Sequence, residues 1–261
     1  MSIFDSEDQK PYSRKYTKSA KAPLPRWLGS AHDPHALDRY VSATPSRIAM
    51  GRVGTRYLTS VYLNMRADHA IAKDAVYSEI AADFPKQLGC VDLRSCSESR
   101  EDYLLYPNKG RRLHADSVAV LEREGTRGCD VQVIVGDGLS AWAAERNVPA
   151  LLPELQGLLE AAGFRVGKPV FVRLARVGVQ DHVGVVLGAK ATVIFVGERP
   201  GLGTGDSLSV YIAYGPKLDQ DNAEKNCISN VRPMGIQTHE AAQHTVEILE
   251  KAFASGRGGL G

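Results

Sequence analysis

Short apolar segments alternate with amphipathic segments throughout the second half of the chain. Four apolar segments predict strands, at residues 130–135, 169–174, 191–196 and 207–214. Apolar positions three and four residues apart predict helices at 148–164, 182–188 and 238–254. Such alternation is typical of a parallel sheet covered by helices on both faces. We therefore expect a Rossmann-like parallel-sheet α/β domain at residues 126–261, with its ligand site outside the carboxyl ends of the strands.

The helix predicted at 148–164 has recognisable ends. Pro149 suits the first turn of a helix, and Gly163 fits the C-terminal cap. The buried stripe between these ends is predicted to consist of Leu151, Leu155, Leu158, Leu159 and Ala162.

The first half of the chain is patterned differently. Between residues 56 and 83, apolar positions recur at helical spacing on one face, which predicts one long helix in a helical region at 49–125. Residues 1–48 are rich in Lys, Arg, Pro and Ser and show little apolar periodicity, so they do not easily bury a core of their own. We expect an extended N-terminal arm, which is either a flexible tail or a segment that orders on a partner's surface.

Composition and charge exclude several classes of protein. The 261 residues are 43% hydrophobic and 24% charged, and the net charge of +2 does not indicate a nucleic-acid binder. No apolar run approaches the roughly 20 residues that cross a bilayer, so we expect no membrane role. The four cysteines form no C-x-x-C pair and there is no secretory apolar segment, which predicts free thiols in a reducing cytoplasm.

The loop GDGLSA (136–141) satisfies the weak dinucleotide-binding pattern G-x-G-x-x-A between a strand and a helix that opens at Ser140. Two features oppose this interpretation: the charge of Asp137 would face a pyrophosphate, and no ribose-binding acid ends the next strand. Arg176 could instead contact a 2′-phosphate. A stand-alone NADP-binding oxidoreductase that uses Gly136, Gly138 and Arg176 therefore remains an alternative.

The glycine-rich loop of VGERPGLGTGDSLSVYIAY (196–214) is not a phosphate loop. A phosphate loop is followed by a helix whose N-terminus faces the anion, whereas period-two alternation predicts a strand at 207–214. The glycines instead make the backbone accessible to a ligand or partner beside Glu198 and Arg199.

The chain contains neither the nucleophile motif G-x-S-x-G nor the zinc-protease motif H-E-x-x-H. A further alternative is RNA binding through the basic residues of the arm, Lys10, Arg14, Lys15, Lys18 and Lys21.

Several motifs together resemble one known family. They are VQVIVGDGLSAWA (131–143), VGERPGLGTGDSLSVYIAYGPK (196–217), NCISNVRPMG (226–235), and upstream GRVGTRYLT (51–59), MRADHAIAKDAV (65–76) and GRRLHADSV (110–118). In order and spacing, the chain resembles the small subunit (light chain) of ethanolamine ammonia-lyase, which depends on adenosylcobalamin. The resemblance covers about residues 45–255 and is far more specific than a single glycine pattern.

The resemblance implies a subunit of a hetero-oligomer. In this family a large subunit carries the substrate and the catalytic residues, so we expect no catalytic residue and no metal site in this chain. Adenosylcobalamin bound between the subunits supports the radical deamination of ethanolamine to acetaldehyde and ammonia. Residues 1–48 would dock on the large subunit. The cofactor contacts carried over by motif are Val177 in ARVGV, Glu198 in GERPG and Cys227 in NCISN.

Two short segments refine these expectations. Proteins that replace the benzimidazole of cobalamin by a histidine use Asp-x-His-x-x-Gly, whereas the nearest segment here, DPHALD (33–38), ends in Asp38. We therefore expect base-on cobalamin. In YPNKGRRL (106–113), Tyr106 and Asn108 replace two charged residues of the family pattern, which would change any ion pair between subunits there. For localisation, the resemblance adds a bacterial microcompartment as an alternative within the cytoplasm.

Overall fold

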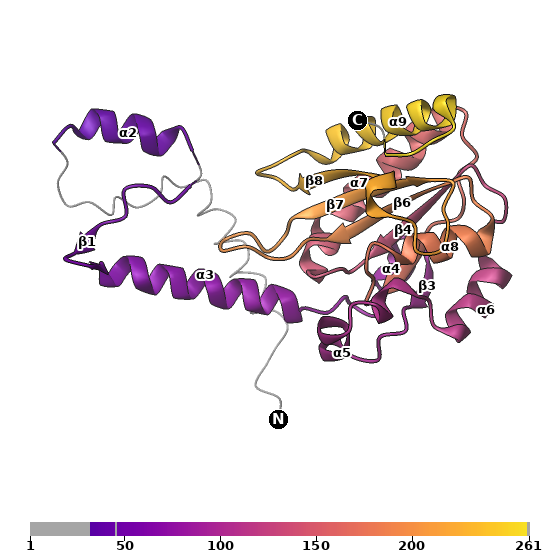
Figure 1. Cartoon of the computed structure of the whole chain (residues 1–261), viewed down its shortest axis with the longest axis horizontal. Helices are drawn as coiled ribbons and strands as arrows, with labels where there is room; N and C mark the ends of the chain where they lie inside the picture. Colours follow the sequence, from indigo (N-terminus) through magenta and orange to yellow (C-terminus); the bar gives the residue numbers. More distant parts are fainter. Residues whose placement is uncertain (1–31, 45, 260–261) are drawn as a thin grey trace. The chain divides into compact units, whose positions relative to one another are not determined.

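The computed structural model describes residues 32–44 and 46–259 (Figure 1). Most of the predicted N-terminal arm, including its five named basic residues, lies outside the described residues. The arm and its role therefore stay predictions, as does the division of the chain at residues 48 and 125. Within the described residues, no helix is long and apolar enough to cross a membrane.

Among the described residues, those up to Ala72 form one compact unit with Gly201–Gly203, and those from Lys73 to Pro200 and from Thr204 onward form a second. The first contains α2 (Pro34–Ser42), the short strands β1 (Arg52–Val53) and β2 (Arg56–Tyr57), and most of α3 (Thr59–Tyr77). Asp33 caps α2, because its side chain accepts a hydrogen bond from the backbone N–H of Ala36 at 3.0 Å. The long helix predicted at 56–83 is thus present but shorter at both ends.

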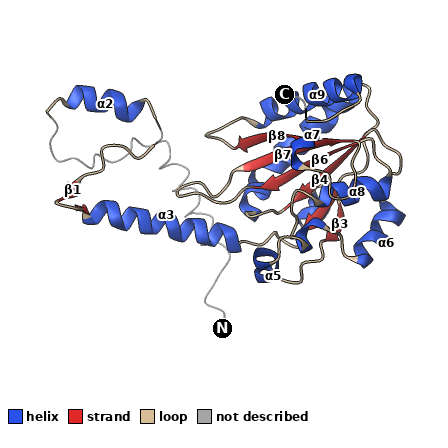
Figure 2. Cartoon of the chain, in the orientation of Figure 1, coloured by secondary structure: helices blue, strands red, loops and turns tan. Residues whose placement is uncertain are grey.

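The second unit is built on a six-stranded sheet with the order β3-β5-β4-β6-β7-β8 (Figure 2). The first four of these strands run parallel, whereas β7 and β8 are antiparallel to their neighbours. The strands are β3 (Val91–Arg94), β4 (Val131–Gly136), β5 (Val170–Arg173), β6 (Ala191–Gly197), β7 (Leu208–Tyr214) and β8 (Lys225–Val231).

The expectation of a wholly parallel sheet was therefore wrong at β7 and β8, and the domain is a mixed α/β fold. A parallel connection requires a long crossover, usually a helix. The connection between β6 and β7, residues 198–207, contains no helix, so β7 turns back beside β6. The pattern also missed β3, a short strand at the sheet edge, and β8, which begins with the buried, charged Lys225.

Helices cover both faces of the sheet, as predicted (Figure 2). On one face α7 (Ala141–Ala161) and α9 (Thr238–Ser255) pack against a core that includes Val133 and Phe195. On the other face α6 (Ala115–Glu124) and α8 (Val179–Leu187) pack against a core that includes Ile134 and Ile194. The central strands β4 and β6 are buried along their whole length, which explains their continuous apolar sequence. The remaining short helices are α4 (Phe84–Gln87), α5 (Arg100–Leu105), η1 (Lys109–Arg111) and η2 (Asn222–Glu224).

The start of α7 differs from the prediction. The helix begins at Ala141, so Pro149 and Pro153 lie inside it rather than in its first turn. An internal proline removes a backbone hydrogen bond and costs about 3 kcal/mol or more in an isolated helix. Here burial of one continuous stripe offsets that cost; it comprises Ala141, Ala144, Val148, Leu151, Leu152, Leu155 and Leu159.

Candidate functional site

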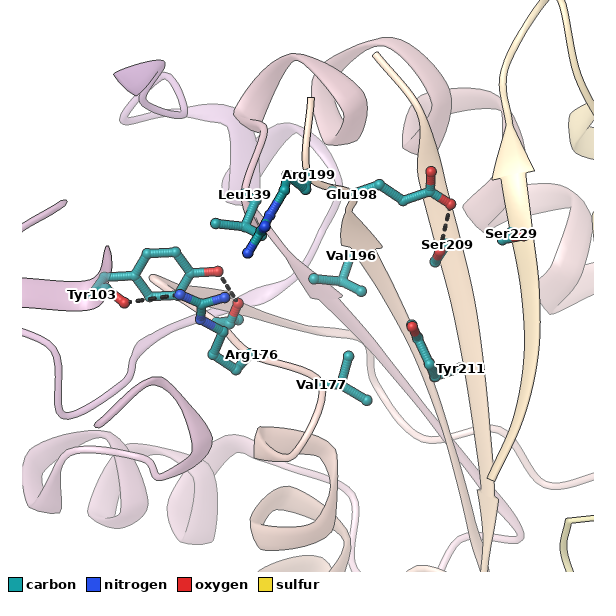
Figure 3. A pocket seen from close by; sticks show the side chains of 12 residues that line it. Tyr103, Leu139, Arg176, Val177, Val196, Glu198, Arg199, Ser209, Tyr211 and Ser229 are labelled. Carbon is teal, nitrogen blue, oxygen red and sulfur yellow. Dashed lines mark hydrogen bonds between the residues drawn. The ribbon is translucent and has the colours of Figure 1, made fainter. Parts of the chain in front are cut away.

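A cavity of about 380 Å³ lies at the carboxyl ends of the parallel strands (Figure 3). Each of the three loops that the sequence placed at strand ends contributes to it, through Leu139 after β4, Val177 after β5 and Glu198 after β6. The remaining lining residues come from these loops, from α5 and from β6, β7 and β8; they are Tyr103, Ala175, Arg176, Val196, Gly197, Arg199, Ser209, Tyr211 and Ser229. The position agrees with the general rule for ligand sites on open α/β sheets.

Glu198 is held in place by the two antiparallel strands. Its Oε1 accepts a hydrogen bond from Ser209 Oγ at 2.6 Å (Figure 3). The same oxygen accepts another from the backbone N–H of Asn230 at 2.8 Å. Within residues 32–44 and 46–259, Glu198 forms no ion pair with Arg199, and its Oε2 accepts no hydrogen bond. One oxygen thus fixes the side chain, and the other remains available to a ligand that donates a hydrogen bond.

Val177 and Cys227 occupy different positions relative to the cavity. Val177 is half-buried, lines the cavity, and packs against the core on the α8 face. Cys227 is exposed on β8 and does not line the cavity, but its cross-strand partner Tyr211 does. The structure therefore brings Val177 and Glu198 together and places Cys227 beside them.

The chemical state of Cys227 agrees with a packing role. Partial burial by neighbouring groups raises the pKa of its thiol. Burial likewise raises the pKa of the Tyr211 hydroxyl to about 12. A thiol whose pKa is raised stays protonated at neutral pH and is a poor nucleophile.

Sequence reasoning missed Tyr103, which forms one wall of the cavity. The centroid of its ring lies 4.9 Å from the guanidinium carbon of Arg100. It lies 4.1 Å from the guanidinium carbon of Arg176, and the Tyr103 hydroxyl donates to Ala175 O at 2.9 Å (Figure 3). Burial raises the pKa of this hydroxyl, which therefore stays a donor. A sequence signal was available: Ser99 and Asp102 form the S-x-x-[DE] pattern of a helix start, and Ser99 Oγ does accept from Asp102 N.

The residues on which the NADP alternative depended are engaged within the chain. Both carboxylate oxygens of Asp137 accept hydrogen bonds from backbone N–H groups just after β5, those of Leu174 and Ala175. Gly138 lies directly against Gly197, and Leu139 N donates to Gly197 O at 2.9 Å. The Arg176 guanidinium stacks on Tyr103 and donates to Tyr103 O at 3.0 Å. The glycine loop therefore joins the ends of three strands, and this arrangement does not support dinucleotide binding.

In the described part of the chain, no group of three or more His, Cys, Asp or Glu side chains is arranged to hold a metal ion. The chemistry of the cavity thus consists of one carboxylate, two arginines, hydroxyl groups, exposed backbone and an apolar wall. Such a mixture binds and orients a ligand that carries both apolar surface and amide or phosphate groups.

Comparisons with known proteins agree on one family. Residues 34–261 match the family described as ethanolamine ammonia-lyase light chain (EutC). The chain is also 40% identical over 233 residues to the ethanolamine ammonia-lyase small subunit of Fusobacterium nucleatum subsp. nucleatum, an alignment that covers 88% of this chain and 79% of that protein. The matched region contains the whole sheet and all the residues that line the cavity. The chain therefore belongs to the ethanolamine ammonia-lyase light-chain family.

Proposed function

We propose that this chain is the small subunit of an adenosylcobalamin-dependent ethanolamine ammonia-lyase and binds part of a base-on cobalamin at its interface with a large subunit. The observation that carries the proposal is the cavity at the strand ends, in which Val177 and Glu198 meet on a chain of this family. The relative from Fusobacterium nucleatum is itself named a small subunit. By analogy, the large subunit supplies the catalytic residues.

The residues of the cavity fit the periphery of cobalamin. This cofactor presents amide side chains, a nucleotide phosphate and apolar edges of its ring. The unoccupied oxygen of Glu198 suits an amide or hydroxyl donor, whereas the exposed Arg199 suits an acceptor such as phosphate. Leu139, Val177 and Val196 supply apolar contact. A cavity of about 380 Å³ encloses only a fraction of so large a molecule, which supports a site shared with another chain.

The chain's own residues contribute binding and orientation. Bound adenosylcobalamin supplies the radical chemistry by which ethanolamine is converted to acetaldehyde and ammonia. Glu198, fixed by Ser209 and the backbone of Asn230, accepts a hydrogen bond from the cofactor and so sets its orientation. Val177 would pack against the cofactor from the cavity wall, and Cys227 would contact it from outside the cavity, next to Tyr211. This preorganisation reduces the entropy that is lost on binding.

The first test of the proposal is the activity of the separate chains. We expect the isolated chain to release no acetaldehyde from ethanolamine when adenosylcobalamin is added, because the proposed catalytic residues lie in the large subunit. Addition of the large subunit from the same organism should restore turnover, measured by a coupled alcohol dehydrogenase assay. Robust turnover by the isolated chain would contradict the proposal.

Glu198→Gln is expected to weaken cobalamin binding about five- to tenfold in the reconstituted complex, since a charged acceptor becomes a neutral one. The amide oxygen can still accept from Ser209 and Asn230, so the thermal midpoint of unfolding should be unchanged. The measurement is an absorbance titration with hydroxocobalamin. Cys227→Ser is the matched control, because it changes a neighbouring contact without removing charge and should retain most of the affinity. An unchanged affinity of Glu198→Gln would assign Glu198 a structural role only.

Base-on binding predicts that no histidine of the complex coordinates cobalt. The segment nearest to the histidine-ligand pattern, at 33–38, forms the capped N-terminus of α2 and ends in Asp38 where the pattern has glycine. We expect the electron paramagnetic resonance spectrum of complex loaded with cob(II)alamin to be the same with natural-abundance and with ¹⁵N-labelled histidine. A nitrogen splitting that changes with the label would overturn base-on binding.

A further inference from the structure

Asp137 is a buried carboxylate that the proposed function does not use. Asp137 is 5% exposed and lies in the loop that follows β4. Oδ1 accepts from the backbone N–H of Ala175 and Oδ2 from that of Leu174, each at 3.0 Å. Each oxygen thus binds one of two successive backbone N–H groups in the segment that follows β5. A bidentate contact of this kind determines the path of a backbone as well as stabilising it.

The segment that Asp137 holds is conformationally strained. Leu174 has a φ of 56°, in the left-handed region where a residue with a branched side chain rarely lies. Such a conformation costs roughly 1–2 kcal/mol and persists only where the surrounding structure imposes it. Leu174 is also the first residue after β5, and the turn it makes directs Ala175, Arg176 and Val177 along the cavity wall. We call residues 174–177 the ligand segment.

Arg100 holds Asp137 and its loop from the opposite side. It is 5% exposed; its Nη1 donates to Gly138 O at 2.8 Å and lies 3.9 Å from Asp137 Oδ2, and its Nε donates to Val76 O at 2.6 Å. The guanidinium therefore compensates the buried charge and fixes the loop that carries it.

Tyr103 forms a second link between the side chains around Asp137 and the ligand segment. Its hydroxyl donates to Ala175 O, so the N–H and the C=O of Ala175 are both bound by side chains, Asp137 and Tyr103 respectively. Its ring contacts the guanidinium groups of both Arg100 and Arg176. The N–H groups of Leu174 and Ala175 and the C=O of Ala175 are thus all bound by side chains distant in sequence. Such contacts can hold a strained backbone in place.

We propose that Asp137, supported by Arg100 and Tyr103, is a positioning residue that keeps the ligand segment in the strained conformation in which Val177 and Arg176 line the cofactor cavity. The inference rests on the proposed function, because the ligand whose affinity it controls is cobalamin. It also explains why an aspartate stands in a loop that resembles a dinucleotide-binding one: the carboxylate binds the protein's own backbone amides in place of a phosphate.

The test compares Asp137→Asn with Asp130→Asn in the complex with the large subunit. Asp130 lies next to the opposite end of β4 and also binds a backbone amide and a cation: it accepts from Arg165 N at 3.0 Å and pairs with Lys190 at 2.9 Å. Its side chain is 13% exposed, against 8% for Asp137. Both substitutions therefore remove a carboxylate that binds a backbone amide and a cation, but only Asp137→Asn touches the ligand segment.

We expect Asp137→Asn to raise the dissociation constant for hydroxocobalamin about tenfold or more, since one charge-assisted hydrogen bond is lost. Hydrogen exchange at the Leu174 and Ala175 amides should become faster in the same protein. Asp130→Asn should change the dissociation constant less than twofold even if it lowers the thermal midpoint as much. Equal affinities of wild type and Asp137→Asn, or equal losses in both variants, would overturn the inference.

If Asp137→Asn does not fold, Tyr103→Phe decides the question, because it removes only the hydrogen bond to Ala175 O and keeps the ring against both arginines. A severalfold weaker hydroxocobalamin affinity, with faster amide exchange in the ligand segment, is expected. Unchanged affinity and exchange would overturn the inference. Failure of the wild-type complex to bind hydroxocobalamin would overturn the proposed function itself, and this outcome is distinct from equal binding by wild type and variant.

Discussion

Replacing Lys225 by methionine is expected to lower the free energy of unfolding by about 3–5 kcal/mol, the usual cost of removing one partner of a buried ion pair. Lys225 Nζ lies 2.9 Å from Asp181 Oδ2 and also donates to Gln220 O at 3.1 Å. The side chains of Lys225 and Asp181 are 1% and 2% exposed. The substitution would leave the Asp181 carboxylate buried without a compensating charge.

The loss should depend on pH in a definite direction. Burial already raises the pKa of Asp181 above its ordinary value, and removal of the cation would raise it further. A carboxyl whose pKa is higher in the folded than in the unfolded state binds more protons when folded, so folding is favoured as the pH falls. Urea unfolding should therefore show a smaller deficit for Lys225→Met at pH 5 than at pH 8.

Two variants control this prediction. Lys217 forms an exposed pair with Glu224 at 3.4 Å, and Lys217→Met should cost less than about 1 kcal/mol. The double variant Asp181→Leu with Lys225→Met replaces both charges and should recover much of the stability. A double variant no more stable than Lys225→Met would show that the methionine is destabilising through its packing and not through the unpaired carboxylate.

The sequence correctly predicted the elements whose local pattern of apolar residues is compatible with only one type of secondary structure. Strands β4, β5 and β6 are apolar because helices cover them on both sides, and the helix that became α9 has a clear amphipathic repeat. The direction of β7 depended on the connection before it, and the absence of a crossover helix there was the better signal. β8 was missed because Lys225 is buried by a partner on α8, which no local pattern reveals.

The position of the candidate site was predictable from the sequence, but the contacts that shape it were not. Topology alone brought the loops after β4, β5 and β6 together, and the family resemblance selected Val177, Glu198 and Cys227 within or near them. The S-x-x-[DE] pattern marks the start of the helix that carries Tyr103, but it does not reveal the role of that residue. The contacts of Tyr103 and Asp137 were not predictable, because each forms a hydrogen bond to a residue more than thirty positions away. The charge of Asp137 was evident, but only the fold shows that it binds backbone amides.

Gly138→Ala is expected to destabilise the protein by about 3 kcal/mol or more and to abolish cobalamin binding in the complex. Gly138 has a φ of 62°, and a Cβ there would lie 2.4 Å from the backbone oxygen of Gly197 and 2.5 Å from its nitrogen. The obstructing atoms belong to the backbone of the residue before Glu198, so they can move only by displacing that side chain. Stability is measured by urea unfolding and binding by hydroxocobalamin titration.

A second glycine separates crowding from backbone conformation. Gly128 has a φ of 65°, close to that of Gly138, but a Cβ there would meet no atom within 4 Å. Gly128→Ala should therefore lose only the roughly 1–2 kcal/mol of the left-handed conformation and should bind hydroxocobalamin normally. Equal losses in the two variants would mean that the loop after β4 can move away from Gly197 without cost. The close contact between the two loops would then not determine the position of Glu198, which would instead depend on its hydrogen bonds to Ser209 and Asn230.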